Sequence, residues 1–144
     1  MKLDISEKGK TFHYELEKEK EKLLRGKKIG DEIDGSLIDS KFKNFKFQIT
    51  GLSNIAGFPG FAKVEGIGLK RVLLTKGKGM SGKRSKKKKK IKGLRLRKTV
   101  RGNTIAKDVA QINLKVLQGN LADVLGKQKK EEKAGEEVKK EEKA

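Results

Sequence analysis

The chain has 144 residues, with 38 Lys or Arg against 19 Asp or Glu, and its formal net charge is +19 at pH 7. Its hydrophobic fraction of 33% lies well below the roughly 45–50% of typical globular domains, so any core must be small. The absence of Cys excludes a disulfide framework, and no apolar run approaches the roughly 20 residues of a membrane span or forms a leader, so we expect a soluble, intracellular protein.

Short segments in which apolar and polar residues alternate predict strands, because period two places one set of side chains on a buried face. In chain order they are Leu3 with Ile5; Phe12, Tyr14 and Leu16; Phe45, Phe47 and Ile49; Leu69, Val72, Leu73 and Leu74; Leu94 with Leu96; and Ile112, Leu114 and Val116. Glycine-containing breaks separate many of them, which favours a small barrel or sandwich. We expect a mainly β fold in the form of a small closed β-barrel, since closure removes exposed strand edges.

Helix signals are weaker and predict two short helices. One falls within residues 15–25, and the other is indicated by Leu121, Val124 and Leu125 at spacing i, i+3, i+4. Residues 127–144 contain one Val as their only large apolar residue, so we expect a charged, solvated tail or a marginal helix with i, i+4 Glu and Lys pairs. The expected organisation is one barrel domain over residues 1–126, which includes a basic extended arm at 76–101, followed by the tail at 127–144.

The charge is concentrated in the segment 66–107, which holds 17 Lys and Arg residues and no Asp or Glu. Such a block repels itself, so a polyanion is the natural partner, and nucleic acid is the leading candidate. The homogeneous lysine run at 86–90 would neutralise phosphates without sequence discrimination, whereas arginines offer a planar fork for defined contacts. Arg95 and Arg97 share one face of a strand and Leu94 and Leu96 the other, which would anchor the cations on the core.

Residues 77–83 (GKGMSGK) match two phosphate-binding patterns and raise the alternative of a nucleotide enzyme. A phosphate-cradling NTPase loop needs Ser or Thr after its Lys, and that position is Arg84. Both patterns also require a following helix, whereas five lysines come next, and no acid follows at the distance needed for a ribose. The glycines are better interpreted as turn residues that let the backbone approach RNA closely.

Other chemistry-bearing residues favour structural roles. His13 is the only histidine and lies on the polar side of its strand, so an exposed strand residue is expected. The acidic residues between 31 and 39 lack calcium-loop spacing and are interpreted as turn residues. Phe58 and Phe61 would either pin a Gly- and Pro-containing loop to the core, which is the favoured interpretation, or stack on an unpaired base. We expect no catalytic residue, metal site or cofactor.

Five stretches in a fixed order resemble the ribosomal protein S6e family of the archaeal and eukaryotic small subunit. They are residues 1–6 (MKLDIS), 57–59 (GFP), 71–77 (RVLLTKG), 95–105 (RLRKTVRGNTI) and 111–114 (QINL). The likeness runs from residue 1 to about residue 118, and the short form is similar to archaeal members. The long C-terminal helix with phosphorylated serines of eukaryotic members has no counterpart, because no Ser follows Ser85.

The resemblance implies a non-enzymatic, ribosome-bound cytoplasmic protein with small-subunit ribosomal RNA and neighbouring ribosomal proteins as partners, and with no membrane or small-molecule substrate. The RNA-binding residues that it implies by position are Lys76, Lys78, Lys83, Arg84, Lys86, Lys87, Lys88, Lys89, Lys90, Lys92, Arg95, Arg97, Lys98, Arg101 and Asn103. A nonspecific DNA-binding, chromatin-type protein is the alternative. Cations in a loop-like arm, without a helix-turn-helix or zinc pattern, favour RNA.

Overall fold

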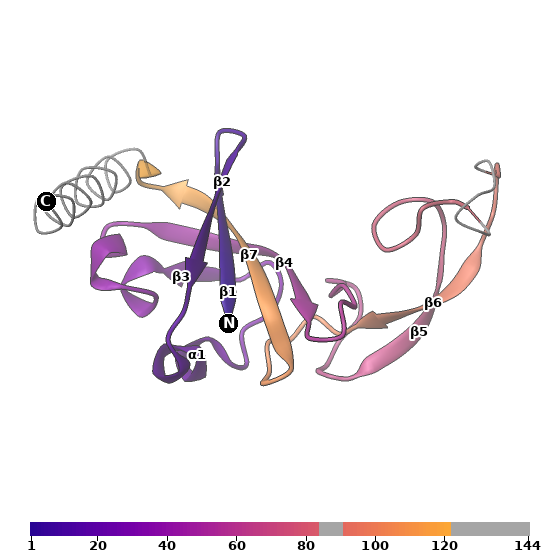
Figure 1. Cartoon of the computed structure of the whole chain (residues 1–144), viewed down its shortest axis with the longest axis horizontal. Coiled ribbons are helices and arrows are strands. Elements are labelled where there is room, and N and C mark those ends of the chain that lie inside the picture. Colours follow the sequence, from indigo (N-terminus) through magenta and orange to yellow (C-terminus); the bar gives the residue numbers. More distant parts are fainter. Residues whose placement is uncertain (84–90, 122–144) are drawn as a thin grey trace, which may run out of the picture.

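The computed structural model describes residues 1–83 and 91–121 and contains two β-sheets (Figure 1). The larger has five strands in the order β2-β1-β7-β4-β3, with β1 and β7 parallel and the other neighbours antiparallel. Its strands are β1 (Lys2–Glu7), β2 (Lys10–Glu15), β3 (Glu32–Asp34), β4 (Lys46–Asn54) and β7 (Val109–Gln118). Apart from β3, these strands fall on the short apolar-polar alternation that the sequence predicts.

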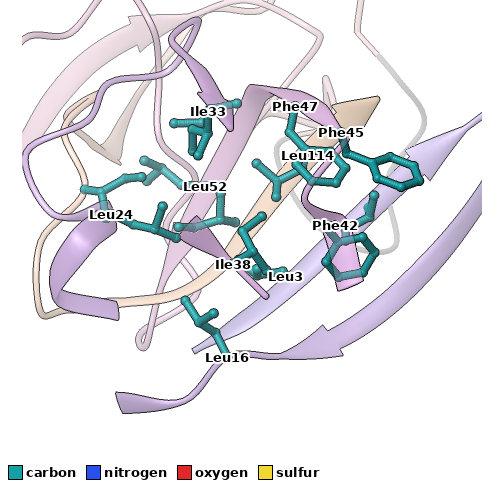
Figure 2. Packing of buried hydrophobic residues seen from close by; sticks show 14 of the residues in the cluster. Leu3, Leu16, Leu24, Ile33, Ile38, Phe42, Phe45, Phe47, Leu52 and Leu114 are labelled. Atoms are coloured by element: carbon teal, nitrogen blue, oxygen red, sulfur yellow. The ribbon is translucent and has the colours of Figure 1, made fainter. Parts of the chain in front are cut away.

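One face of this sheet forms the hydrophobic core (Figure 2). Leu3 of β1 lies beside Ile112 of β7, and Phe47 and Ile49 of β4 are buried on the same side. Phe42 contacts the rings of Phe45 and Phe47 edge-on, at 5.7 Å between centroids in both pairs. These aromatic pairs add specific contacts to the burial of apolar surface, which is the main source of folding free energy in a core this small.

Three short helical segments cover the core where a second sheet layer would otherwise be needed. They are α1 (Lys18–Leu24) and the 3-10 helices η1 (Gly35–Leu37) and η2 (Ser40–Phe42), which contribute the buried Leu24 and Phe42 among others. The Tyr14 hydroxyl donates a 2.7 Å hydrogen bond to Asp39, next to η2. Burial, together with this hydrogen bond, raises the pKa of Tyr14 to about 12.

The second sheet is a two-stranded antiparallel ribbon of β5 (Leu69–Leu74) and β6 (Leu96–Arg101), called the ribbon from here on. It projects from one side of the larger sheet, at the right of Figure 1. Residues 59–61 join the two sheets, because the Gly60 N–H donates to Leu52 in β4 and the Phe61 N–H donates to Arg101 in β6.

The closed barrel expected from the sequence is wrong. Within residues 1–83 and 91–121 the larger sheet ends at β2 and β3, which do not pair with each other, and β5 and β6 pair only as the separate ribbon. Two features explain the open form. The ribbon strands have too few buried side chains to extend the core, with Leu69 and Leu73 about half exposed, and α1, η1 and η2 cover the face that closure would have buried.

Other expectations have mixed outcomes. The helix predicted within 15–25 is confirmed as α1, whereas β3 was not predicted. The remainder of the helix predicted from Leu121 onward, and the tail at 127–144, lie outside the described residues. No helix in the described part of the chain is long and apolar enough to cross a membrane.

Candidate nucleic-acid interface

The ribbon has two faces, which follow from its strand register. In an antiparallel pair, residues directly opposite each other point to the same side. Leu69, Arg71 and Leu73 therefore share one face with Arg101, Thr99 and Arg97, and we call it the arginine face. Lys70, Val72 and Leu74 share the other with Val100, Lys98 and Leu96, and we call it the lysine face.

Most of the described cations that the sequence nominates for RNA lie exposed on the ribbon or in the loop that joins its strands. They are Lys76, Lys78, Lys83, Lys92, Arg95, Arg97 and Lys98. None of these seven forms an ion pair with a carboxylate in the described residues. Arg84 and Lys86 to Lys90 lie outside the described residues. The exposed cations thus form a surface whose charge the described part of the chain leaves uncompensated.

Two further exposed cations belong to this surface and were missed by the sequence reasoning. Lys70 and Arg71 of β5 lie opposite Val100 and Thr99 of β6. The signal was available, because both residues fall within the acid-free segment and within the predicted strand around Leu69 and Val72. Both residues lie before the basic arm predicted at 76–101.

Arg95 and Arg97 occupy positions of the alternation that the sequence predicts. Both are exposed, and the intervening Leu94 and Leu96 are half-buried. The predicted anchoring on the core is wrong, however, since both leucines are absent from the main core cluster, and Leu96 lies opposite Leu74 within the ribbon. The ribbon therefore carries its cations on a small packing unit of its own.

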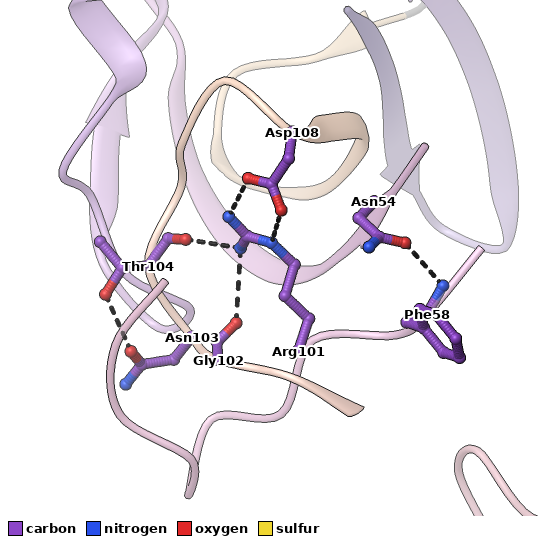
Figure 3. Close-up of polar contacts among 7 residues, drawn as sticks. All are labelled: Asn54, Phe58, Arg101, Gly102, Asn103, Thr104 and Asp108. Carbon is purple, nitrogen blue, oxygen red and sulfur yellow. Dashed lines mark hydrogen bonds and ion pairs between the residues drawn. The ribbon is translucent and has the colours of Figure 1, made fainter. Parts of the chain in front are cut away.

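Arg101 does not belong to the exposed surface, contrary to its nomination as an RNA contact (Figure 3). Its side chain is 0% exposed, and its guanidinium donates two hydrogen bonds to the Asp108 carboxylate, at 2.8 and 2.6 Å. A further bond of 2.6 Å reaches the Thr104 carbonyl. The hydrogen bonds from Arg101 hold the pKa of Asp108 below its usual range. Arg101, the last residue of β6, is therefore a structural residue at this end of the ribbon.

Asn103 is also a correction to the nominated set. It is 7% exposed, and its side-chain amide donates to the Ala62 carbonyl at 3.2 Å while its Oδ1 accepts from the Thr104 hydroxyl at 3.0 Å. Both partners are internal to the protein. Asn103 thus fixes the loop beside residues 59–61 from a buried position.

The glycine motif at 77–83 forms a tight turn. The Gly77 and Met80 backbones bond to each other in both directions, at 3.0 and 3.1 Å, and Gly79 has a φ of +76°, which a residue with a side chain rarely adopts. The segment described after the turn, up to Lys83, contains no helix. The turn is therefore confirmed, whereas the close approach of these glycines to RNA stays a prediction. The helix that both nucleotide-binding patterns require does not begin within that segment.

Phe61 supports this turn. A Cβ placed on Gly79 would lie 3.3 Å from the Phe61 ring, and the Lys78 ammonium lies 5.5 Å from the centroid of that ring. Neither Phe58 nor Phe61 belongs to the main core cluster, so the favoured interpretation, anchoring to the core, is wrong for that core. Phe61 instead lies against Lys78 and Gly79 in the loop that joins the ribbon strands.

The remaining chemistry-bearing residues are accounted for structurally. The His13 side chain is 79% exposed, as expected, and its Nδ1 lies 2.6 Å from Asp4. No group of three or more His, Asp or Glu side chains in the described residues could hold a metal ion. Glu32 and Asp34 lie exposed on β3, where charged residues at a sheet edge oppose pairing with another chain.

These features define a class: a small, mainly β protein with an open sheet and a projecting ribbon of uncompensated cations. Comparison with known proteins agrees with that class and identifies the family. The family model described as ribosomal protein S6e matches residues 1–139. The chain belongs to the ribosomal protein S6e family.

Similar proteins carry one name. The chain is 41% identical over 121 residues to the small ribosomal subunit protein eS6 of Methanococcus maripaludis, which covers 84% of this chain and 88% of that protein. It is 42% identical over 110 residues to the eS6 protein of Thermoplasma acidophilum, with 76% and 81% covered. The eS6 protein of Methanocaldococcus jannaschii is 43% identical over 105 residues, with 73% and 72% covered. The resemblance noted in the sequence is confirmed.

Proposed function

We propose that this chain is a structural constituent of the small ribosomal subunit and binds ribosomal RNA through the ribbon and its joining loop. Family membership supports the ribosomal role, and the relatives are named as small-subunit proteins. The observation that carries the RNA contact is the surface of exposed cations on and beside β5 and β6, in a segment without a single acidic residue.

Binding through this surface is electrostatic and non-enzymatic. Each ammonium or guanidinium that meets a phosphate releases a condensed counterion, so affinity falls with salt by a log-log slope of about −0.7 to −0.9 for each phosphate neutralised. The larger sheet acts as a platform. Residues 1–126 then form one functional domain, with 76–101 as its RNA-binding arm, and Lys70 and Arg71 extend that arm onto β5.

The proposed setting follows from this role. The partners are small-subunit ribosomal RNA and the ribosomal proteins beside it, and the protein resides on cytoplasmic ribosomes to support translation. No cofactor or small-molecule substrate is required, because neutralising phosphates needs only fixed cations.

Sedimentation of the full-length chain with small subunits tests the proposal. We expect the protein to sediment with the small subunit and to leave it only at high salt. Replacing four exposed arm lysines by Gln (Lys76, Lys78, Lys83 and Lys92) should lower the salt concentration that releases it.

A matched control removes the same charge from the larger sheet, α1 and the loops beside them, by replacing Lys10, Lys18, Lys43 and Lys46 by Gln; these lysines are also exposed. This variant should be released close to the wild-type salt concentration. Equal effects of the two variants would assign binding to net charge alone. Free protein at moderate salt, with DNA recovered in its place, would favour a chromatin-type role.

A further inference from the structure

Large apolar side chains are exposed on the ribbon and just before it. Ile67, Leu69 and Leu73 are 54%, 51% and 55% exposed, and Leu69 and Leu73 both lie on the arginine face. A two-stranded ribbon is marginally stable at best on its own, and exposed apolar side chains grouped on one face mark an interaction surface.

The two faces of the ribbon differ in the kind of cation they carry. The exposed cations of the arginine face are Arg71 and Arg97, whereas those of the lysine face are Lys70 and Lys98. Lysine acts as a strongly hydrated point charge, whereas the guanidinium plane is weakly hydrated and stacks on flat rings. The faces therefore suit different kinds of contact.

The lysine face is already partly covered from within the protein. Its apolar members are half-buried or buried, with Val100 only 1% exposed, and a Cβ on Gly79 would lie 3.5 Å from Leu74. The turn at 77–80 thus packs toward this side. The arginine face, by contrast, leaves Leu69 and Leu73 open to a partner.

We propose that the arginine face of the ribbon, formed by Leu69, Arg71, Leu73 and Arg97, docks an RNA segment with unpaired bases. This inference rests on the proposed function and specifies the RNA class that one face of the site takes. Charge complementarity favours RNA, because Arg71 and Arg97 are exposed on this face and the segment 66–107 that contains it has no Asp or Glu. Unpaired bases supply the flat apolar rings that a stacked duplex hides, and both Arg planes and Leu side chains complement them.

The lysine face has a different task in the same complex. Lys70 and Lys98 contact phosphates irrespective of pairing, so they add affinity without selecting between paired and unpaired RNA. The arginine face therefore recognises unpaired bases, whereas the lysine face neutralises phosphate charge.

Two RNA duplexes of equal length and charge test the inference, one fully paired and one with an internal loop of unpaired bases. The full-length wild type should bind the looped RNA about tenfold more tightly, in line with one stacked base or more. The double variant Arg71→Lys with Arg97→Lys keeps the net charge. It should lose this preference while its binding to the paired duplex and its salt slope stay unchanged.

Two further variants separate the faces. Leu73→Gln removes an exposed apolar contact and should reduce the preference without unfolding the protein, which circular dichroism checks. Lys70→Gln with Lys98→Gln is the matched control on the lysine face and should weaken binding to both duplexes equally.

The outcomes are distinguishable from failure of the proposed function. If the wild type bound neither RNA, the proposed contact with ribosomal RNA itself would be refuted. Binding without preference, or a preference that survives Arg71→Lys with Arg97→Lys, would overturn only the docking of unpaired bases. A third result would also overturn only the docking of unpaired bases: Leu73→Gln leaves RNA binding intact but abolishes binding to small-subunit proteins stripped of RNA. The arginine face would then be a protein contact.

Discussion

A guanidinium group without solvent contact needs a counter-charge and hydrogen-bond acceptors, and Arg101 finds both within the next seven residues. Asp108 supplies the charge, and the Thr104 carbonyl adds a further acceptor. Removing one partner of such a pair leaves an uncompensated buried charge, which costs more than the pair itself contributes.

Asp108→Asn is expected to lower the free energy of unfolding by about 3 kcal/mol, the lower end of the range for one partner of a buried pair, because the Asp108 side chain is 46% exposed. Chemical denaturation of both proteins at neutral pH measures this. Asp34→Asn, at an exposed acid on β3, is the control and should change stability by no more than about 0.5 kcal/mol.

The pH dependence of this difference has a defined sign. The pKa of Asp108 is lowered below 3.8 in the folded protein, so the unfolded chain takes up the proton first on acidification. The stability that Asp108 contributes is therefore present above pH 3.8 and is lost as pH falls through its folded pKa. The stability gap between wild type and Asp108→Asn should narrow over that window. A gap that stayed constant there would contradict the ion pair.

The burial of Arg101 also shows that a charge pattern does not determine which cations are exposed. The sequence places Arg101 in an acid-free block, and the block ends at Asp108. That first acid was the available signal for an internal ion pair. Exposure depends on how residues 102–108 fold back over the guanidinium, and this cannot be read from the number of cations.

At the scale of elements, close backbone approach fixes where the ribbon begins. A Cβ on Gly102 would lie 1.9 Å from the Gly66 carbonyl oxygen, which no small shift of a side chain can relieve. Gly102→Ala should therefore destabilise the protein by about 1–3 kcal/mol or more, as overpacking does in tightly packed sites. Thermal unfolding measures the loss. Gly68→Ala is the control, because a Cβ added to Gly68 would meet no atom within 4 Å and this glycine has no positive φ; an equal loss in both variants would contradict this account.

The sequence predicts strands well where apolar and polar residues alternate regularly. It fails where tertiary contacts decide whether a strand forms or which strands pair. Strands β1, β2, β4, β5 and β7 fall on predicted apolar-polar segments, and β6 overlaps the segment predicted at Leu94 and Leu96 only at Leu96. Strand β3 has three residues with Ile33 as its one apolar member, too short a pattern to recognise. The barrel was inferred from strand number and turn frequency, and neither specifies which strands pair. Pairing instead follows burial, which excludes the ribbon from the larger sheet.

At the scale of the whole molecule, charge and core are separated along the chain. Residues 1–65 hold 13 bases and 11 acids, and much of the five-stranded sheet lies there, whereas the ribbon and its loop lie in the acid-free segment. A near-neutral platform folds without strong self-repulsion, and the repelling cations are carried on a projection. The chain-level charge pattern thus predicted the location of the candidate site, although not its division into two faces.

The central claim is that phosphates compensate the ribbon's cations, and the salt dependence of RNA binding tests it most directly. Binding of the full-length chain to small-subunit ribosomal RNA should weaken steeply with salt, with a log-log slope of about −0.7 or steeper for each contacted phosphate. Replacing Lys70, Lys76, Lys78 and Lys98 by Gln should make this slope shallower by about 3, one step of about 0.7–0.9 for each lost contact. A slope near zero for the wild type, or a slope that the four replacements leave unchanged, would contradict the claim.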